Sequence, residues 1–381
     1  MSAATIDTLT RLRGATAGLI LAGGSAVRLV GMDKGRLVVG GQSLFARAAA
    51  ALGPQTATLA LSANGPAGRL ADLGLPVLAD EVAGLGPLGG LLAGLDWAAR
   101  QGFAWLLTAP ADTPFLPPDL LLRLGHAARA ARAPAAIAAS GARAHGVVGL
   151  WDVALAPHLR ARLFEAGQRK VGAWSEACGA AIALWPDEPA DPFFNVNTPA
   201  EHQEAERLAA RRPARGGAVV VARGEDGAPL LAALAAELRA EGIGLGGLLQ
   251  EGSKAGGDRP EAVRLVALDT GEAFPILQRL GGGGACMVDE QAVCGASGAL
   301  RRAVAGRLSP VLVNKFGPLE AEGLGLADDM RAVMAEGLAL LTTVTEARLE
   351  AWLRFCGGEC ALLFDELDAL RRWWRERAAP G

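Results

Sequence analysis

The sequence lacks both an excess of positive charge and a long hydrophobic run. The 381-residue chain carries 37 Lys and Arg residues against 40 Asp and Glu residues, a formal net charge of −3. This balance offers no basic surface for nucleic acid or for an anionic membrane. None of the apolar runs approaches the roughly 18 to 20 residues that cross a bilayer. We therefore expect a soluble protein that binds neither nucleic acid nor membrane.

Cysteine is also sparse, and its distribution does not indicate a disulfide framework. The five cysteines are odd in number and scattered along the second half of the first domain and beyond. Disulfide-dependent secreted domains usually show an even, closely spaced set. Cys356 and Cys360 lie one helical turn apart and are a candidate half of a metal site, but no histidine or second close cysteine pair accompanies them. We expect ordinary thiols and a reduced, cytoplasmic environment.

Lysine accounts for only four of the 37 basic residues, and one of the four follows a glycine turn. The apolar run from Leu19 to Leu21 is typical of a buried strand. Gly23 and Gly24 come next, where the absence of Cβ atoms lets backbone N–H groups approach anionic oxygens. Arg28 and Lys34 add positive charge beside this turn. The pattern indicates a phosphate-binding site.

Other interpretations of this turn stay open at this point. A dinucleotide-binding fingerprint requires Gly-x-Gly-x-x-Gly and a Walker loop requires Gly-x-x-x-x-Gly-Lys-Ser/Thr, and neither is present. Arg11 and Arg13, followed by the apolar run 15–26, resemble a secretory signal, but cleavage there would destroy the turn. A turn with a purely structural role is the remaining alternative.

Composition divides the chain into two predicted domains, 1–212 and 216–377. Between them, the sequence Arg-Arg-Pro-Ala-Arg-Gly-Gly at 211–217 has the proline, charge and glycine typical of a linker. Upstream, predicted strands alternate with predicted helices, which indicates a three-layer α/β sheet. The expected strands are 19–22, 56–62, 76–79 and 105–109, and the expected helices are 43–52, 88–100, 118–133 and 198–210.

Two aspartates follow predicted strands at the edge of the sheet that carries the glycine turn. Asp80 follows the strand 76–79, and Asp112 follows the strand 105–109. A carboxylate at this edge is suited to hold Mg²⁺ together with the phosphates of a nucleotide. Asp112 precedes Thr-Pro, so a local turn or helix cap is the alternative. Gly-Pro-Leu-Gly-Gly at 86–90 opens a helix, where free N–H groups attract anions, or it forms a tight turn only.

Two further segments contain polar residues of interest. Thr198, Pro199 and Glu201 form a capping box at the start of a helix, which leaves Asn195 and Asn197 without an assigned role. The sequence Gly-Gln-Arg-Lys-Val at 167–171 is a small cationic loop, which by itself is usually a solvated surface feature. The histidines show no spacing for a metal.

Taken together, these motifs resemble the molybdenum cofactor guanylyltransferases over roughly residues 17 to 208. The resemblance rests on four segments whose order and spacing match the family: 21–35, 86–90, 110–114 and 195–199. It implies a Rossmann-like nucleotidyltransferase fold, with GTP and molybdopterin as substrates and Mg²⁺ as cofactor.

The resemblance also implies roles for individual residues. The glycine loop, with Leu21, Ala22, Gly23, Gly24 and Lys34, would hold GTP, Asp80 would contact the nucleotide, and Asp112 would bind both nucleotide and Mg²⁺. Asn195, Asn197, Arg169 and Lys170 would lie toward the molybdopterin side. The sequence departs from the family at Leu29, where Met is usual, at Ser62, where an Asn commonly contacts the nucleotide, and at Gly146, where Pro is usual. Asn64, two residues after Ser62, is a candidate substitute.

The predicted second domain reads as another α/β unit. Its loop Arg-Gly-Glu-Asp-Gly-Ala-Pro at 223–229 occupies the place of a phosphate loop but lacks the Lys and the Ser/Thr. The segment 311–317, with Glu320 and Glu322, resembles a P-loop-like domain of unknown function that accompanies molybdenum proteins. Expected strands are 219–221, 262–269, 310–314 and 338–344, and expected helices are 228–241, 327–336 and 366–377.

The reaction that these features predict is nucleotidyl transfer without a side-chain nucleophile. Arg28 and Lys34 would neutralise the phosphates and Asp112 would hold Mg²⁺. Within this class, a cytidylyltransferase or a sugar-phosphate nucleotidylyltransferase is the alternative. From another class, the chain is a non-catalytic carrier that binds the finished cofactor and hands it to a molybdoenzyme through the second domain. The expected protein partners are molybdoenzymes or other cofactor-biosynthesis proteins.

Overall fold

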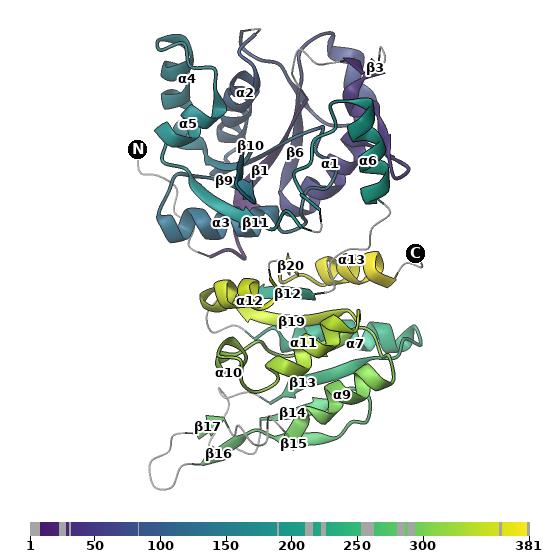
Figure 1. The fold of residues 1–381 in the computed structure, drawn as a ribbon. Helices are drawn as coiled ribbons and strands as arrows, with labels where there is room; N and C mark the ends of the chain where they lie inside the picture. Colours follow the sequence, from purple (N-terminus) through teal and green to yellow (C-terminus); the bar gives the residue numbers. More distant parts are fainter. Residues whose placement is uncertain are drawn as a thin grey trace. The chain divides into compact units, whose positions relative to one another are not determined.

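The computed structural model describes residues 8–22, 28–29, 32–82, 84–188, 190–209, 216–221, 226–252, 263–279, 286–288, 293, 295–357 and 360–378. The chain forms two compact units, Met1–Arg211 and Arg212–Gly381. Each unit contains one seven-stranded sheet (Figure 1).

The sheet of the first unit is parallel except for one strand. Its order is β11-β9-β10-β8-β1-β6-β7, and only β10 runs antiparallel to its neighbours β8 and β9. The strands are β1 (Thr16–Leu21), β6 (Thr58–Ser62), β7 (Val77–Leu78), β8 (Trp105–Pro110), β9 (Ala135–Ser140), β10 (Arg143–Asp152) and β11 (Ala181–Trp185), with short hairpin strands β2 (Arg28–Leu29), β3 (Met32–Asp33), β4 (Val38–Val39) and β5 (Gln42–Ser43) outside the sheet.

Helices cover both faces of this sheet. Figure 1 shows α2, α4 and α5 on one side and α1 on the other. A buried cluster that includes Leu19, Leu95, Trp151 and Trp174 fills the space under α2, α4 and α5. The predicted three-layer α/β architecture is therefore confirmed. The helices are α1 (Leu44–Leu52), α2 (Pro87–Arg100), α3 (Leu120–Ala131), α4 (Ala156–Phe164), α5 (Val171–Ala177) and α6 (Pro199–Ala209).

The sequence analysis missed one side of this sheet. Strands β9, β10 and β11 and helices α4 and α5 were not predicted. Strand β9 reads Ala-Ala-Ile-Ala-Ala-Ser and is buried at every position. Alanine is the strongest helix former, so burial between layers overrides local propensity here.

The second unit also contains a mixed sheet, in the order β15-β14-β13-β18-β19-β12-β20. Strands β13, β18, β19, β12 and β20 are parallel, while β14 is antiparallel to β13 and β15. The predicted second α/β domain is confirmed as a fold class. The strands are β12 (Gly216–Val221), β13 (Gly246–Glu251), β14 (Arg264–Ala267), β15 (Ala273–Pro275), β18 (Val311–Val313), β19 (Leu340–Thr345) and β20 (Cys360–Leu363), with a separate hairpin of β16 (Leu277–Arg279) and β17 (Cys286–Val288).

Its helices are α7 (Ala228–Ala240), α9 (Gly298–Ala305), α10 (Pro318–Ala321), α11 (Ala327–Ala335), α12 (Leu349–Phe355) and α13 (Leu367–Ala378). The sequence analysis did not predict strands β13, β15, β16, β17 and β20 or helices α9, α10 and α12. The expectation that Cys356 and Cys360 lie one helical turn apart was wrong, because α12 ends at Phe355 and Cys360 begins β20.

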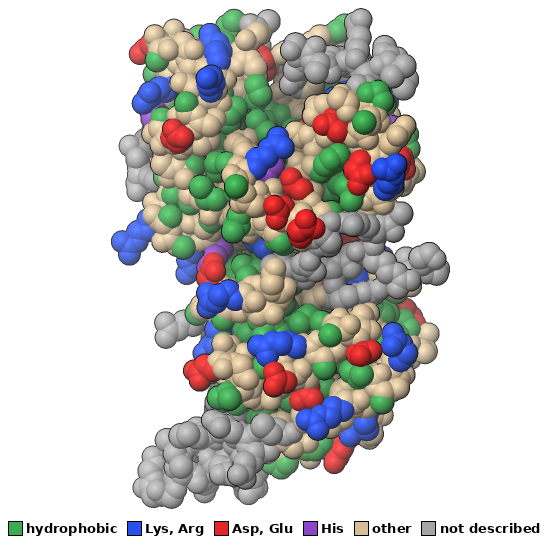
Figure 2. Space-filling view, viewed as in Figure 1, with side chains coloured by type: hydrophobic (Ala, Val, Ile, Leu, Met, Phe, Trp, Pro, Cys, Tyr) green, Lys and Arg blue, Asp and Glu red, His purple; other side chains and the backbone are tan. Residues whose placement is uncertain are grey.

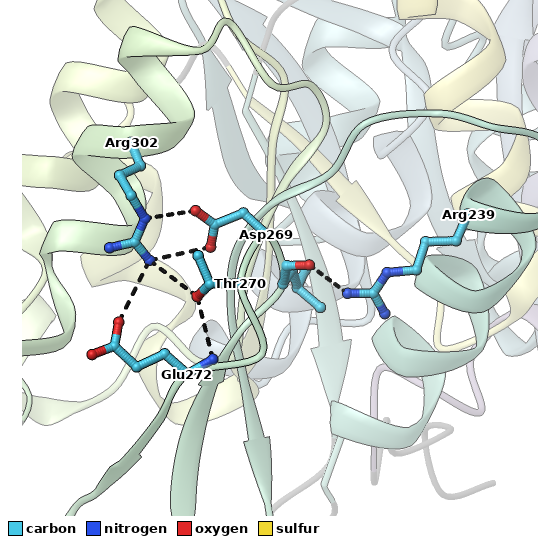
Figure 3. Close-up of polar contacts among 6 residues, drawn as sticks. Arg239, Asp269, Thr270, Glu272 and Arg302 are labelled. Carbon is cyan, nitrogen blue, oxygen red and sulfur yellow. Dashed lines mark hydrogen bonds and ion pairs between the residues drawn. The ribbon is translucent and has the colours of Figure 1, made fainter.

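Two arginines hold the turn between β14 and β15 (Figure 3). Arg302 of α9 donates to Asp269 at 2.7 Å and lies 3.9 Å from Glu272, while Arg239 of α7 donates to the carbonyl oxygen of Leu268 at 2.6 Å. The hydrogen bond from Arg302 lowers the pKa of Asp269. These contacts tie the antiparallel edge of the sheet to its helices.

The surface mixes charges of both signs. On the face in Figure 2, Lys and Arg side chains are interspersed with Asp and Glu side chains over the described parts of both units. Within the described ranges, none of the helices is both long and apolar enough to cross a membrane.

Candidate active site

The carboxyl ends of four strands meet at one edge of the first sheet. Leu21 pairs with Ser62 on one side and with Pro110 on the other, and Ser62 pairs with Leu78. Hydrogen bonds just beyond these strands extend the alignment: Ala22 N donates to Ser62 O and Ala111 N donates to Leu21 O, both at 2.9 Å. Residues that follow these strands are therefore held at a common edge, where α/β sheets bind their ligands.

Lys34, Asp112 and Asn197 meet at this edge from three distant parts of the chain. The Nζ of Lys34 lies 2.5 Å from Asp112 Oδ2 and 2.6 Å from Asn197 Oδ1. Lys34 begins a short 3₁₀ helix, Asp112 follows β8, and Asn197 precedes α6. The Lys34 and Asp112 side chains are only 12% and 24% exposed. An ammonium group carries three N–H donors, so one remains for another acceptor.

The second carboxylate oxygen of Asp112 is buried without a partner. Among the described residues, Oδ1 of Asp112 accepts no hydrogen bond. A buried, uncompensated carboxylate oxygen costs free energy, and a cation would satisfy it. The described residues contain no cluster of three His, Cys, Asp or Glu side chains that could hold a metal alone. One carboxylate oxygen suits Mg²⁺, which usually takes one or two carboxylates together with phosphates and waters.

The segment before α6 is fixed against the loop that carries Asp112. Val196 N donates to the carbonyl oxygen of Asp112 at 3.0 Å, and Thr113 Oγ1 donates to Asn195 Oδ1 at 2.7 Å. Asn195 therefore contacts Thr113, a residue to which the sequence analysis assigned no role. Its position directly after Asp112 was the signal in the sequence that could have indicated a role at the site.

The predicted capping box is present and orients Asn197. Glu201 Oε2 accepts hydrogen bonds from the N–H groups of Asn197 and Thr198, each at 2.7 Å, and Glu201 N donates to Thr198 Oγ1 at 3.2 Å. The hydrogen bond from the backbone N–H of Asn197 is the main reason why the pKa of the Glu201 carboxyl is lowered. The positive charge of Lys34 lowers this pKa further. The cap thus holds the backbone of the residue whose side chain contacts Lys34.

Asp80 and Asn64 form a second polar pair. Asn64 Nδ2 donates to Asp80 Oδ2 at 2.8 Å, and Asp80 N donates to Asn64 Oδ1 at 3.0 Å. Both ends of the Asn64 amide are therefore engaged by Asp80. Ser62 is 2% exposed and lies under α2.

Glycines allow α2 to approach these residues closely. A Cβ atom on Gly90 would lie 2.4 Å from Ser62 Oγ, and one on Gly89 would lie 2.9 Å from Asp80 Oδ2. Gly86 has a φ of +65°, which L side chains rarely adopt. Gly89 and Gly90 thus have a packing role, and Gly86 has a conformational one.

The remaining predicted site residues are not joined to these clusters by any described contact. Gly23 and Gly24 lie outside the described residues. Arg28 pairs with Asp33 in a two-stranded hairpin directly before Lys34, and its side chain is also outside the described part. Arg169 donates to the carbonyl oxygens of Leu163 and Gln168, both at 2.9 Å, and Lys170 is exposed at the start of α5.

Two family models match the chain, one for each unit. Residues 18–178 match the MobA-like NTP transferase domain. Residues 217–373 match a model described as a protein of unknown function, DUF2478. Both matches agree with the resemblances found in the sequence.

Curated relatives cover the first unit. The molybdenum cofactor guanylyltransferase of Rhodopseudomonas palustris (strain BisB5) is 50% identical over 200 residues, 52% of this chain and 95% of that protein. The protein of the same name from Nitrobacter hamburgensis is 47% identical over 198 residues, 51% of this chain and 95% of that protein. A solved structure of molybdopterin-guanine dinucleotide biosynthesis protein A from Archaeoglobus fulgidus is 22% identical, covers 51% of this chain and 98% of its own, and has a TM-score of 0.42.

Proposed function

The chain belongs, through its first unit, to the family of molybdenum cofactor guanylyltransferases, and we propose that it transfers GMP from GTP to molybdopterin. The terminal phosphate oxygen of molybdopterin attacks the α-phosphorus of GTP, the bond between the α-phosphorus and the bridging oxygen breaks, and pyrophosphate leaves. The product is molybdopterin guanine dinucleotide. The observation that carries this proposal is the contact of Lys34 with Asp112 and Asn197 at the carboxyl ends of the strands.

Lys34 is proposed to stabilise the negative charge that develops on the phosphates. Its ammonium group is held at two points, so it is oriented before a substrate arrives and needs little reorganisation during the reaction. Arg28 is proposed to contact the same phosphates, together with the N–H groups of Gly23 and Gly24. Leu21 and Ala22 are proposed to support the nucleotide from the end of β1.

Asp112 is proposed to hold Mg²⁺ through its buried oxygen Oδ1. The ion, when bound, would neutralise phosphate charge and make the α-phosphorus more electrophilic. Lys34 keeps the other oxygen, Oδ2, in place at 2.5 Å, which fixes the orientation of the carboxylate. Asp112 would thus contact both the ion and the nucleotide.

The remaining residues divide into a nucleotide side and an acceptor side. Asp80 is proposed to contact the nucleotide, and Asn64 to hold the Asp80 carboxylate in position, with Ser62 beneath them. Asn195 and Asn197 are proposed to face molybdopterin, with Arg169 and Lys170 contributing positive charge for its phosphate. Molybdopterin and GTP are then the two substrates.

The decisive experiment measures the product and the nucleotide preference directly. The protein is incubated with Mg²⁺, molybdopterin and either GTP or CTP, and the product is identified by mass while pyrophosphate release is followed. We expect the guanine dinucleotide and one pyrophosphate for each product formed. A cytosine dinucleotide would contradict guanylyl transfer, and tight binding of the finished cofactor without any product would favour the carrier.

A further inference from the structure

Asn314, in the second unit, has a buried amide nitrogen without a hydrogen-bond partner. The residue is 3% exposed and directly follows β18. Its Nδ2 has no partner in the part of the chain that the structure describes. Buried amide donors are nearly always paired, because removing one from water without a partner costs free energy. The exception therefore requires an explanation.

The Asn314 amide is held in a defined orientation. Thr343 of β19 donates from Oγ1 to Asn314 Oδ1 at 2.7 Å, so the oxygen side of the amide is occupied and the nitrogen side is not. Backbone bonds fix the flanking chain: Asn314 N donates to Leu248 O and Phe316 N donates to Thr343 O, both at 3.0 Å. The unpartnered donor thus has a defined position and orientation at the carboxyl end of the sheet.

Two sources of positive charge are found close to Asn314, one in the sequence and one across the sheet. Lys315, the next residue, is exposed, and its side chain forms no ion pair or hydrogen bond with the described residues. The thirteen-residue helix α7 begins next to the Thr343 side chain, because a Cβ atom on Gly227, the cap of α7, would lie 2.5 Å from Thr343 Cγ2. The amino end of a helix carries partial positive charge.

The nearby carboxylates are already engaged. Asp226 Oδ1 accepts from Ala228 N at 3.0 Å. The two oxygens of the buried Glu320 accept from Gly317 N at 2.9 Å and Leu326 N at 3.2 Å. No described hydrogen bond joins Asp226 or Glu320 to the Asn314 amide, and the buried donor, the exposed ammonium and the helix end all favour an anion.

We propose that the second unit binds a phosphoryl group at the carboxyl end of β18, through the Asn314 amide and the Lys315 ammonium. The chemistry is that of a phosphate monoester or a nucleotide phosphate, bound by one buried donor and one positive charge. The site lies in a different unit from the transferase residues. The proposal therefore stands or falls independently of the proposed function.

The chain offers an unusually direct test, because it contains only four asparagines: Asn64, Asn195, Asn197 and Asn314. Full-length protein labelled with ¹⁵N-asparagine gives four side-chain amide signals, three from the first unit and one from the second. Asn314→Asp assigns the fourth signal by removing it. Inorganic phosphate and ADP are then titrated separately. We expect the Asn314 signal to shift and to saturate with both probes. If the site binds a nucleotide, ADP should bind more tightly than inorganic phosphate. If the site binds the phosphoryl group alone, the two affinities should be equal.

Two variants complete the test. Lys315→Ala, at an exposed position, should raise the half-saturation concentration at the Asn314 signal about tenfold, the usual loss for a charge-assisted contact. The control Arg372→Ala removes an exposed cation from α13 and should change nothing. The proposal is overturned if the Asn314 signal does not move with either probe, or if Lys315→Ala leaves its half-saturation concentration unchanged.

Discussion

Lys34 is the residue whose removal should affect turnover most directly. Its ammonium contacts Asp112 and Asn197, and its remaining donor is proposed to contact phosphate. We expect Lys34→Ala to lower kcat/KM by about a hundredfold, or about 3 kcal/mol of transition-state stabilisation, the usual loss for one preorganised donor. Steady-state transfer assays at several GTP concentrations measure this. The exposed Arg372→Ala variant serves as the control, and near-normal turnover in Lys34→Ala would remove this residue from the mechanism.

Asp112→Asn tests the metal site with an almost isosteric change. The variant keeps the size of the side chain but loses the negative charge that would bind Mg²⁺, so we expect turnover to be abolished and the melting temperature to be retained. Binding of Mn²⁺, followed by electron paramagnetic resonance, provides a measurement that does not depend on activity. If Mn²⁺ binds the variant as tightly as the native protein, the ion is held elsewhere.

At the scale of one helix, the close approach of α2 to β6 depends on Gly90. A Cβ atom there would lie 2.4 Å from Ser62 Oγ, so Gly90→Ala should lower the free energy of unfolding by about 1–3 kcal/mol through overpacking. Gly172→Ala on α5, where a new Cβ meets nothing within 4 Å, is the matched control.

The same contact predicts coupling between the two residues. Ser62→Ala removes the oxygen that the new methyl group would meet, so Gly90→Ala should be less destabilising in that background. Denaturant unfolding of the two single variants and the double variant measures the coupling free energy. Strictly additive effects would show that the Ser62 side chain does not limit the approach of α2.

The cap of α6 should make stability depend on pH through Glu201. Its pKa is lowered in the folded protein, so its contribution is complete above the ordinary value of 4.5 and is lost as the pH falls through the folded value. At neutral pH, Glu201→Ala should cost about 1 kcal/mol, as for other helix caps. The difference in melting temperature between Glu201→Ala and the native protein should become smaller as the pH is lowered into the acidic range.

A matched variant separates the cap from general charge effects. Glu204→Ala removes a half-exposed carboxylate of the same helix, which among the described residues forms an ion pair with Arg207 at the surface, and should change stability little at either pH. A Glu201→Ala difference that stayed constant down to acidic pH would contradict the role of the ionised carboxylate.

For the molecule as a whole, we propose that the two units are separable in function. Every residue proposed for transfer precedes position 198, and the compact units divide at Arg211. A chain truncated after Arg212 should therefore fold and still form the guanine dinucleotide at a rate close to that of the full chain. The segment from Gly216 onward should not hydrolyse GTP or ATP appreciably, because 223–229 has neither a phosphate-binding lysine nor a hydroxyl group for Mg²⁺.

Transfer assays on the truncated chain and phosphate release from the second segment check this division of labour. If a folded 1–212 chain does not catalyse the transfer, both units are required for catalysis. If the second segment hydrolyses GTP or ATP and Lys315→Ala abolishes this activity, the phosphoryl site is a catalytic site.

By itself, the sequence determined the fold class, the family and the edge of the first sheet at which chemistry is expected. These depend on local signals. Glycines after an apolar run, aspartates after strands, and a Thr-Pro-x-Glu cap each reflect the backbone geometry of a few consecutive residues. The same locality explains what was missed: the alanine-rich β9 has no local strand signal, because alanine favours helix and only its neighbours in space make this segment a strand.

Only the tertiary structure decided which of these residues meet. Lys34 reaches Asp112 and Asn197 across separations of 78 and 163 residues, and no local pattern encodes such a distance. The unpartnered oxygen of Asp112 and the unpartnered nitrogen of Asn314 are likewise invisible in the sequence. Whether a buried polar atom has a partner depends on how all neighbouring elements pack around it, and that packing is a property of the folded chain as a whole.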